Sequence, residues 1–554
     1  MGYFDYKRRR SSEVRIGNVM VGGDNPVRLQ SMTNTSTMDT DGSVAQAERI
    51  AAAGGEIVRL TAQGVREADN IGVIRSRLHS QGVKVPLVAD IHFNPRAAFA
   101  AAQVTDKVRI NPGNFVDPGR TFIKLTYTDE EYQAELDKID NAFTPFLELC
   151  REHGTAIRIG VNHGSLSDRI MSRYGDTPAG MVESAMEFLR IAVKRNFTNI
   201  VISIKASNVV IMVETVRRLV AAMDAEKMHF PLHLGVTEAG DGEDGRVKSA
   251  VGIGTLLLEG IGDTIRVSLS EAPENEIPVA QALVEYIATK ADMPPIAGSE
   301  YEGHDHIAPT RRSTTAVGTV GGQNAPLIGT EVNALPSEMR MELDVTDGID
   351  SHLDEIRLNP SRVLILSTHH GNQATSIAAA VHALMSHGID NPVIAKLTYN
   401  GIPAEKATLY AATDFGYLLL HGLIDGMILS ADTLTEKETD SLSLNILQAS
   451  RQRISKTEYI ACPGCGRTLF NLESTLRAVK EATSHLKGLK IGVMGCIVNG
   501  PGEMADADYG YVGAASGHIS LYKGKQCIEK NIPQENAIPK LIELIKAGGD
   551  WKEP

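Results

Sequence analysis

The stretch Glu56–His92, EIVRLTAQGVREADNIGVIRSRLHSQGVKVPLVADIH, contains the unit from which the first half of the chain is built. Two runs rich in β-branched residues, Glu56–Thr61 and Pro86–His92, flank a helical pattern over Asp69–Gln81. A strand, a helix and a second strand in this order predict a parallel βαβ unit. Each run ends in polar side chains, and this feature recurs along the chain.

The same alternation continues to about residue 290, with further helical patterns over Ser43–Ala53 and Thr177–Arg195. The candidate strands are Val27–Asn34, Glu56–Thr61, Pro86–His92, Lys107–Pro112, Ala156–Asn162, Asn199–Ser207, His233–Ala239 and Thr264–Ser270. Eight such strands match the size of a (β/α)8 TIM barrel, which we predict for residues 1–292. An open doubly wound sheet is the alternative, but no Gly-x-Gly-x-x-Gly follows the first strand.

Basic residues stand at or near the ends of several candidate strands, where TIM barrels carry their chemistry. They are Arg59, Arg109, Arg158, Lys205 and Arg266. Any one of them alone is more often part of a surface ion pair. Converging on one mouth, they repel each other unless an anion lies among them, and the planar arginine fork suits phosphate oxygens. We therefore expect a ligand with at least two phosphate groups.

Two carboxylates, Asp90 and Glu238, occur among these strand ends. Glu238 is the better acid–base candidate, because the flanking glycines of Gly235-Val-Thr-Glu-Ala-Gly240 permit close approach of a substrate. Asp90 is suited to orient a hydroxyl group or an arginine. For either residue the alternative is a purely structural partner of an arginine.

Gly252-Ile-Gly-Thr255 is expected to open the helix between the seventh and eighth strands. Barrels commonly bind phosphate there through backbone N–H groups at a helix N-terminus. Close helix packing is the alternative use of these glycines.

A second chemical centre lies between Cys462 and Glu503, a window that holds three of the five cysteines. Cys462-Pro-Gly-Cys465 with a distant third cysteine, Cys496, is a metal-site spacing. Zinc ribbons usually return a second cysteine pair or two histidines, whereas here one cysteine returns. Three thiolates and a weaker ligand favour an iron–sulfur cluster with a labile fourth position. A zinc site, or a cysteine pair with an unrelated Cys496 in the core, remains an alternative.

The fourth ligand is open at this point, with Glu503, Asn499 and Asp506 in reach of Cys496. Cys527 lies in a polar stretch away from these loops, and we interpret it as a bystander. Cys150 falls on the apolar stripe of the helical stretch Ala142–His153, which indicates a core thiol.

Length and composition narrow the functional classes. A chain of 554 residues is too long for one core, and 42% hydrophobic with 22% charged residues is typical of a globular protein. A net charge of −13 argues against a nucleic-acid partner. Five cysteines indicate a reducing compartment. With no long apolar run and no secretory signal, we expect a cytoplasmic protein without a membrane association.

The middle of the chain is predicted to be an inserted, smaller α/β domain over 293–455, followed by an α/β iron–sulfur domain over 456–554. Alternating strand and helix patterns resume at Arg362 and end at Ser450. Histidines occur in pairs, at His304 and His306 and at 369–370, without cysteines or ordered carboxylates beside them. Surface or core positions are therefore favoured for them, and the domain is expected to be architectural.

Several motifs resemble one enzyme family, 4-hydroxy-3-methylbut-2-en-1-yl diphosphate synthase of the non-mevalonate isoprenoid pathway. They are Ser-Met-Thr-Asn-Thr (31–35), Ala-Asp-Ile-His-Phe (89–93), Arg-Ile-Asn-Pro-Gly-Asn (109–114), Arg-Ile-Gly-Val-Asn (158–162), Gly-Val-Thr-Glu-Ala-Gly (235–240), Cys-Pro-Gly-Cys-Gly-Arg-Thr (462–468) and Gly-Cys-Ile-Val-Asn-Gly-Pro-Gly-Glu (495–503). The middle domain resembles the insertion of plant-type and some bacterial members.

The resemblance implies reductive ring opening and dehydration of the cyclic diphosphate 2-C-methyl-D-erythritol 2,4-cyclodiphosphate. Two electrons would pass from ferredoxin or flavodoxin through a [4Fe–4S] cluster. The implied cluster ligands are Cys462, Cys465, Cys496 and Glu503. The implied substrate-binding residues are Arg59, Arg109, Arg158, Lys205, Arg266 and Ser268, with Asp90, Asn111 and Asn162 nearby. Glu238 would be the acid that manages protons as a hydroxyl group leaves.

Family members without the insertion share their site between subunits, so the insertion suggests that one chain here closes on itself. A single chain and a homodimer both fit the sequence. Two other classes remain as alternatives. One is a TIM-barrel lyase or aldolase of a phosphorylated metabolite with a C-terminal zinc module. The other is a non-catalytic metal-binding interaction protein.

Overall fold

The computed structural model describes residues 3–116, 126–497, 502, 504 and 506–553. The chain forms two compact units. The barrel unit comprises residues 10–245, 262–281 and 456–554, and the inserted unit comprises residues 1–9, 246–261 and 282–455. Within the described ranges, no helix is both long enough and apolar enough to cross a bilayer.

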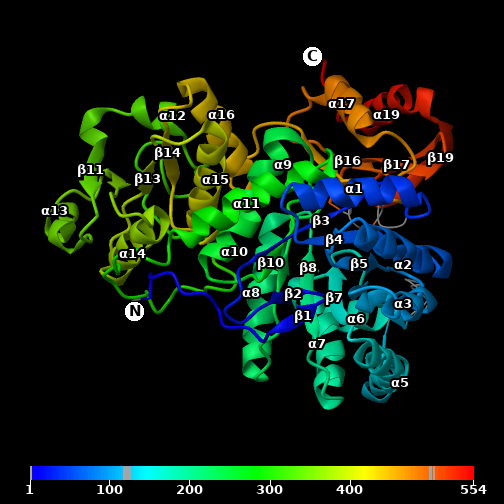
Figure 1. Cartoon of the computed structure of the whole chain (residues 1–554). Coiled ribbons are helices and arrows are strands. Elements are labelled where there is room, and N and C mark those ends of the chain that lie inside the picture. Colours follow the sequence, from blue (N-terminus) through cyan, green and yellow to red (C-terminus); the bar gives the residue numbers. More distant parts are fainter. Residues whose placement is uncertain (1–2, 117–125, 498–501, 503, 505, 554) are drawn as a thin grey trace. The chain divides into compact units, whose positions relative to one another are not determined.

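The barrel unit is built on eight parallel strands, which confirms the predicted TIM barrel (Figure 1). They are β3 (Arg28–Met32), β4 (Ile57–Thr61), β5 (Leu87–Asp90), β6 (Lys107–Ile110), β7 (Ala156–Asn162), β8 (Ile200–Lys205), β9 (His233–Leu234) and β10 (Thr264–Ile265). Their order is β8-β7-β6-β5-β4-β3-β10-β9. A parallel bridge between Ile202 and Leu232 joins the two end strands and closes the barrel.

Helices follow the strands in the expected alternation. They are α1 (Thr40–Ala52), α2 (Val65–Ser80), α3 (Pro95–Ala102), α4 (Pro112–Phe115), α5 (Asp129–His153), α6 (Asp168–Tyr174), α7 (Pro178–Lys194), α8 (Val209–Ala225), α9 (Gly242–Ser249), α10 (Thr255–Leu258) and α11 (Glu276–Ala288). Helix α2 begins four residues before its predicted start, at Val65. The Glu67 carboxylate accepts hydrogen bonds from the backbone N–H groups of Gln63 at 2.6 Å and Gly64 at 2.8 Å, which supports the exposed helix start.

A short N-terminal hairpin, which the sequence analysis did not predict, covers the amino end of the barrel. It consists of β1 (Val14–Ile16) and β2 (Val19–Val21). Its valine and isoleucine side chains form one buried apolar cluster with residues of four barrel strands, Ile57, Val88, Ala156 and Val201. The amino end is therefore filled with apolar side chains, and the carboxyl end is left for polar ones.

The last hundred residues add a five-stranded mixed sheet to the barrel unit (Figure 1, orange to red). Its strands are β15 (Glu458–Ala461), β16 (Lys490–Met494), β17 (Tyr509–Ala515), β18 (His518–Lys523) and β19 (Gln526–Pro533). Helices α17 (Leu472–Thr483) and α19 (Gln534–Gly548) complete it, and their apolar faces share one buried cluster with the strands. We call residues 456–553 the cysteine module.

The inserted unit contains a four-stranded parallel sheet of β11 (Arg340–Asp344), β12 (Val363–Ser367), β13 (Val393–Thr398) and β14 (Gly426–Ser430). Its helices include α12 (Gly329–Asn333), α13 (Leu353–Arg357), α14 (Gln373–Ser386), α15 (Ala404–Leu420) and α16 (Glu436–Ala449). The predicted alternation from Arg362 to Ser450 is confirmed, whereas β11 was not predicted because its Arg340-Met-Glu-Leu-Asp344 sequence is half polar.

The phosphate-binding interpretation of Gly252–Thr255 is wrong. The helix starts at Gly242, about ten residues earlier, so these backbone N–H groups lie inside a continuous helical segment with a π-helical turn over Ala250–Gly254. A Cβ atom added to Gly254 would lie 2.3 Å from the Thr413 hydroxyl oxygen of α15. The glycine therefore allows close helix packing, the alternative considered above.

Replacing Gly254 with alanine should consequently destabilise the inserted unit. In an exposed helix, Gly→Ala is stabilising by about 0.5–1 kcal/mol, but overpacking a well-packed contact costs about 1–3 kcal/mol. We expect the second effect to dominate and to lower the thermal midpoint in differential scanning calorimetry. Thr413→Ala in the same chain should restore part of the loss, and an unchanged or raised midpoint in Gly254→Ala would contradict the packing role.

Candidate functional site

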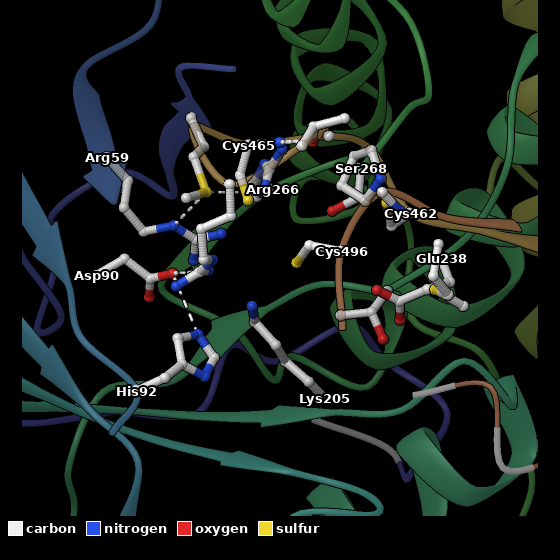
Figure 2. Close-up of a pocket in the computed structure, with 18 residues that line it drawn as sticks. Arg59, Asp90, His92, Lys205, Glu238, Arg266, Ser268, Cys462, Cys465 and Cys496 are labelled. Atoms are coloured by element: carbon white, nitrogen blue, oxygen red, sulfur yellow. Dashed lines mark hydrogen bonds and ion pairs between the residues drawn. The ribbon is translucent and has the colours of Figure 1, made fainter. Parts of the chain in front are cut away.

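A pocket lies between the carboxyl ends of the barrel strands and the cysteine module (Figure 2). Its barrel lining includes Arg59, Asp90, His92, Lys205, Glu238, Arg266 and Ser268, and its module lining includes Cys462, Cys465, Arg467 and Cys496. Strand ends of the barrel and both cysteine loops of the same chain therefore meet around one space. Figure 2 shows Lys205 and Glu238 around the same space as Cys462, Cys465 and Cys496.

The cysteine module is held on the barrel by backbone contacts, hydrogen bonds and ion pairs. A parallel bridge joins Ala239 to Ala461, and the Ser270 hydroxyl donates to the Cys462 carbonyl at 2.9 Å. Two lysines of the module pair with aspartates that follow β9, Lys480 with Asp241 of the loop and Lys456 with Asp244 of α9. These contacts set the position of the Cys462 loop over the barrel mouth.

Both cysteine loops follow strands, as predicted. Strand β15 leads into Cys462 and β16 into Cys496, and the Gly495 N–H donates to the Cys462 sulfur at 3.2 Å. Burial raises the pKa of the Cys462 thiol, so a cation is needed to keep a thiolate there. Glu503, the predicted fourth ligand, lies outside the described residues.

Arg467 supplies positive charge beside these sulfurs, and the sequence analysis did not single it out. Burial alone would lower its pKa, but the Cys465 thiolate and the Asp90 carboxylate raise the pKa of Arg467 above its ordinary value. Its place two residues after Cys465, within the quoted motif, was the available signal. Arg467 thus links the two halves of the pocket electrostatically.

Asp90 is the carboxylate around which the buried cations gather. Its oxygens lie 3.5 Å from Arg109 Nη1, 3.6 Å from Arg158 Nη2 and 3.4 Å from Arg467 Nη2. Burial alone would raise its pKa, but the charges of Arg59, His92 and Arg109 hold the pKa of Asp90 well below its ordinary value. Asp90 is therefore ionised, and it neutralises part of the positive charge.

Arg109, Asn111 and Asn162 are buried but do not line the pocket. Arg109 donates to the Asn162 side-chain oxygen at 2.7 Å and to the Gly160 carbonyl at 2.9 Å, and it contacts the His92 ring. The Asn111 side chain accepts from the Gly113 N–H at 3.2 Å and caps α4. These contacts favour a supporting position beneath the pocket.

Arg158 and Arg59 are buried with incomplete hydrogen bonding. Within the described part of the chain, all three guanidinium nitrogens of Arg158 and Nη1 of Arg59 have no hydrogen-bond partner. Burial, followed by the charges of Arg59 and Arg109, holds the pKa of Arg158 well below its ordinary value. Burial likewise lowers the pKa of Arg59 to about 10. This geometry is unfavourable without an anion, because buried donors are costly to leave unpaired.

Lys205 is also a cation that lies close to other cations. Burial and the nearby Arg59 and Arg158 hold the pKa of Lys205 well below its ordinary value. Arg266 differs, because the buried Glu276 carboxylate accepts from its Nε and Nη2 at 2.9 Å each. Glu276 also accepts from the Ser31 hydroxyl at 2.6 Å. Sequence reasoning missed Glu276 because it opens a helix and does not end a strand.

Glu238 is buried at the pocket wall with a backbone φ of 51°. This left-handed conformation is rare for a residue with a side chain, and such strain occurs most often at functional positions. The surrounding glycines were the sequence signal, and the structure places the carboxyl group in the same pocket as the cysteines.

The remaining cysteines lie elsewhere. Cys150 is fully buried on α5, which confirms the predicted core thiol. Cys527 is on β19, the strand at the end of the mixed sheet, and does not line the pocket.

Comparisons with known proteins point to one family. Residues 11–281 match the GcpE TIM-barrel domain, and residues 458–547 match the GcpE protein C-terminal domain. The chain is 54% identical to 4-hydroxy-3-methylbut-2-en-1-yl diphosphate synthase (flavodoxin) of Phocaeicola vulgatus, over 100% of both chains. Proteins of the same name from Parabacteroides distasonis and Porphyromonas gingivalis are 54% and 48% identical, over 100% and 99% of both chains respectively.

The incomplete hydrogen bonding of Arg158 predicts that substitution of two buried arginines affects thermal stability and pyrophosphate binding in opposite ways. Arg158→Met should leave the ligand-free thermal midpoint unchanged or raised, because it removes a buried, poorly paired charge. It should also weaken pyrophosphate binding about tenfold or more, since a charge-assisted hydrogen bond is worth about 1.5–3 kcal/mol. Thermal shift and calorimetric titration measure both effects.

Arg169→Met is the matched control, because Arg169 is equally buried but donates to Glu187 at 2.7 Å. Breaking this pair should cost about 3–5 kcal/mol, with pyrophosphate affinity retained. A lower ligand-free midpoint in Arg158→Met, together with unchanged pyrophosphate affinity, would show that Arg158 is structural.

Proposed function

Because this chain belongs to the 4-hydroxy-3-methylbut-2-en-1-yl diphosphate synthase family, we propose that it converts 2-C-methyl-D-erythritol 2,4-cyclodiphosphate into (E)-4-hydroxy-3-methylbut-2-en-1-yl diphosphate. The ring opens, two electrons are consumed, and one hydroxyl group is protonated and leaves as water. The observation that carries the proposal is one pocket lined by buried cations and by three cysteines. Among the described residues, Nη1 of the pocket cation Arg59 has no hydrogen-bond partner.

The donor set fits an iron–sulfur cofactor. Three thiol groups from two loops share the pocket, a backbone N–H points at one sulfur, and Arg467 favours thiolates. We assign Cys462, Cys465 and Cys496, with Glu503, as the residues that hold a [4Fe–4S] cluster. When bound, the cluster supplies electrons one at a time to the substrate. A carboxylate is a more easily displaced ligand than a thiolate, which suits Glu503 to an exchangeable position.

The cationic side of the pocket would bind the diphosphate. Arg59, Lys205 and Arg266 line the pocket and are proposed to contact phosphate oxygens directly, with the Ser268 hydroxyl as a further donor. Arg158 does not line the pocket, but it is buried beside Asp90, and its guanidinium nitrogens have no hydrogen-bond partner among the described residues. Bidentate arginine–phosphate contacts would relieve the unpaired donors and the mutual repulsion.

Asp90, Arg109, Asn111 and Asn162 are proposed to hold this constellation in place. Asp90 balances charge, and Asn162 orients the Arg109 guanidinium through its 2.7 Å hydrogen bond. Pre-positioned donors of this kind lose little entropy when the substrate binds. These four residues are therefore assigned to the site because they hold the substrate-binding side chains in position.

Glu238 is proposed as the acid that protonates the departing hydroxyl group. It lines the same pocket as the cations, and burial limits the access of water to its carboxyl group. The strained backbone limits the positions that this carboxyl group can take.

Flavodoxin is the proposed electron donor, with ferredoxin as the alternative, because the names of the relatives specify flavodoxin. The division into barrel (1–292), inserted domain (293–455) and cluster domain (456–554) is also part of the proposal. We infer that the inserted domain lets one chain complete its own site. This inference is supported by the pocket that barrel and cysteine module of one chain line together.

The reaction and its residue roles are tested by turnover of the cyclodiphosphate with reduced flavodoxin. Glu238→Gln should lower kcat about 10²–10⁴-fold, the usual contribution of a general acid, with iron and sulfide content unchanged. Cys462→Ser should lose both the visible cluster absorbance and activity. Cys527→Ser is the matched control and should retain both. A wild-type chain that contains zinc in place of iron and sulfide, and does not turn over, would favour the lyase alternative.

Completion of the site within one chain is tested by mixing two inactive variants, Glu238→Gln and Cys462→Ser. If each pocket is built from one chain, the mixture has no intact pocket, and activity should stay at the sum of the two variants. Co-expression followed by separation of tagged pairs excludes slow subunit exchange as a cause. Recovery toward a quarter or more of wild-type activity would show that pockets form between chains.

A further inference from the structure

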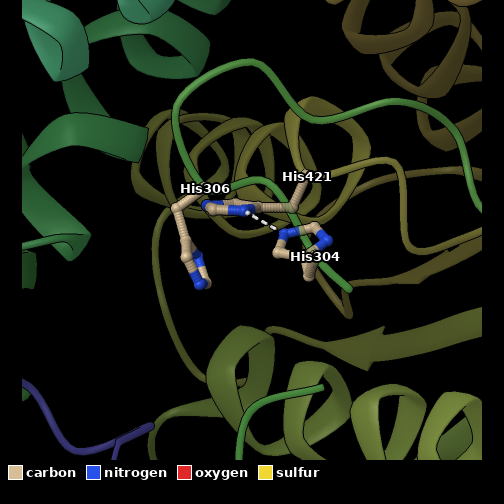
Figure 3. Close-up of side chains that lie close together, drawn as sticks. All are labelled: His304, His306 and His421. Atoms are coloured by element: carbon tan, nitrogen blue, oxygen red, sulfur yellow. Dashed lines mark hydrogen bonds between the residues drawn. The ribbon is translucent and has the colours of Figure 1, made fainter. Parts of the chain in front are cut away.

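Three histidines of the inserted unit lie close together (Figure 3). One imidazole nitrogen each from His304, His306 and His421 lies within 4.8 Å of the other two. His304 and His306 are on the segment between α11 and α12, whereas His421 follows the last residue of α15. Two imidazoles spaced two residues apart and a third from a distant helix end form a common type of transition-metal site.

His421 has a feature that is usual for metal-bound histidines. Its Nε2 lies 3.1 Å from the Glu259 carboxylate, which can only accept, so Nε2 bears the proton. Nδ1 therefore presents a lone pair, and it faces His304 Nε2 at 3.2 Å. A carboxylate that fixes the tautomer of a histidine from behind is the usual second partner of a metal-bound imidazole.

The distance between these two nitrogens also matches a metal site. Tetrahedral zinc with Zn–N bonds of about 2.0–2.1 Å separates its ligand nitrogens by about 3.3–3.4 Å. The observed 3.2 Å is close to this edge length. The position at the C-terminus of the 17-residue helix α15 favours a cation as well, because the helix dipole is negative there.

His306 can complete the trio from the more accessible side. Its side chain is 35% exposed, so its ring can rotate toward the other two and a metal ion can enter from solvent. The Glu300 carboxylate contacts its Nε2, and the Tyr3 hydroxyl lies 2.7 Å from its Nδ1. Glu300 thereby places a carboxylate beside His306, and this oxygen can take the fourth position that zinc requires once the His306 ring has turned.

His382 borders the cluster but is not a ligand. Its ring centroid is 4.8 Å from that of His304, and its Nδ1 already accepts from the Tyr301 N–H at 3.0 Å. The ring of His382 therefore forms a wall of the cluster.

We propose that His304, His306 and His421 bind a Zn²⁺ ion, with Glu300 as the oxygen ligand and Glu259 as the positioning residue behind His421. All donors are imidazole nitrogen or carboxylate oxygen, and zinc sites in proteins use both. The ion would tie the 304–306 loop to the C-terminus of α15 and to the 246–261 segment. The site is a structural clip, independent of the pocket at the barrel mouth.

The test uses the anaerobically purified full-length chain with its iron–sulfur cluster intact, titrated with ZnCl2. We expect one zinc ion per chain beyond the iron, a raised thermal midpoint, and a zinc X-ray absorption spectrum with nitrogen and oxygen neighbours only. His306→Ala removes a half-exposed loop side chain, so the chain should fold normally and bind zinc at least tenfold more weakly. Glu259→Gln should weaken binding about 10–100-fold, the usual effect of a second ligand shell.

His369→Ala is the matched control, because His369 lies in the same unit with an 88% exposed side chain. It should bind zinc as the wild type does. Sulfur neighbours in the spectrum would place the zinc in the cysteine pocket and overturn the proposal. Equal zinc affinity in the wild type and in His306→Ala, or no zinc retained by the wild type, would overturn it as well.

Discussion

The barrel unit depends on how it accommodates positive charge in its interior. Asp90 lies within 3.6 Å of guanidinium nitrogens of Arg109 and Arg158, and Arg467 of the cysteine module reaches it from the other side. A fully buried arginine is tolerated only when it is paired or when a ligand anion completes its environment. One carboxylate serves several arginines here, so the residual charge is available to a phosphate-bearing ligand.

The same charge explains why the cysteine module and the barrel function as one unit. Arg467 responds to both the cysteine sulfurs and Asp90, so the electrostatics of the two halves are coupled. The Cys462 thiol, whose pKa burial raises, is stabilised as a thiolate only in the company of cations. Arg467 thus contributes both to anion binding and to the stability of the thiolates. The ion pairs of Lys456 and Lys480 hold the cysteine module in its position on the barrel.

The sequence predicted the barrel well because β-branched strands and polar strand ends are local patterns. All eight strands form within their expected ranges, and Arg59, Lys205 and Glu238 line one pocket. Residues that act through distant contacts could not be found this way. Glu276 serves Arg266 from a helix start, and Glu259 contacts His421 across 162 positions. The prediction for the glycines before Thr255 was wrong because they lie inside a helical segment. Gly254 is needed there for close packing against Thr413, a contact that the sequence does not reveal.

The hairpin at the amino end of the barrel determines from which end small molecules reach the barrel interior. Val14, Ile16 and Val21 fill that end with fully buried apolar side chains, so the interior has an entrance at the opposite end. The cysteine module covers this entrance, and its contacts with the barrel are a few hydrogen bonds and ion pairs. Small molecules that reach the pocket therefore pass between the barrel mouth and the cysteine module, at the end of the barrel opposite the hairpin.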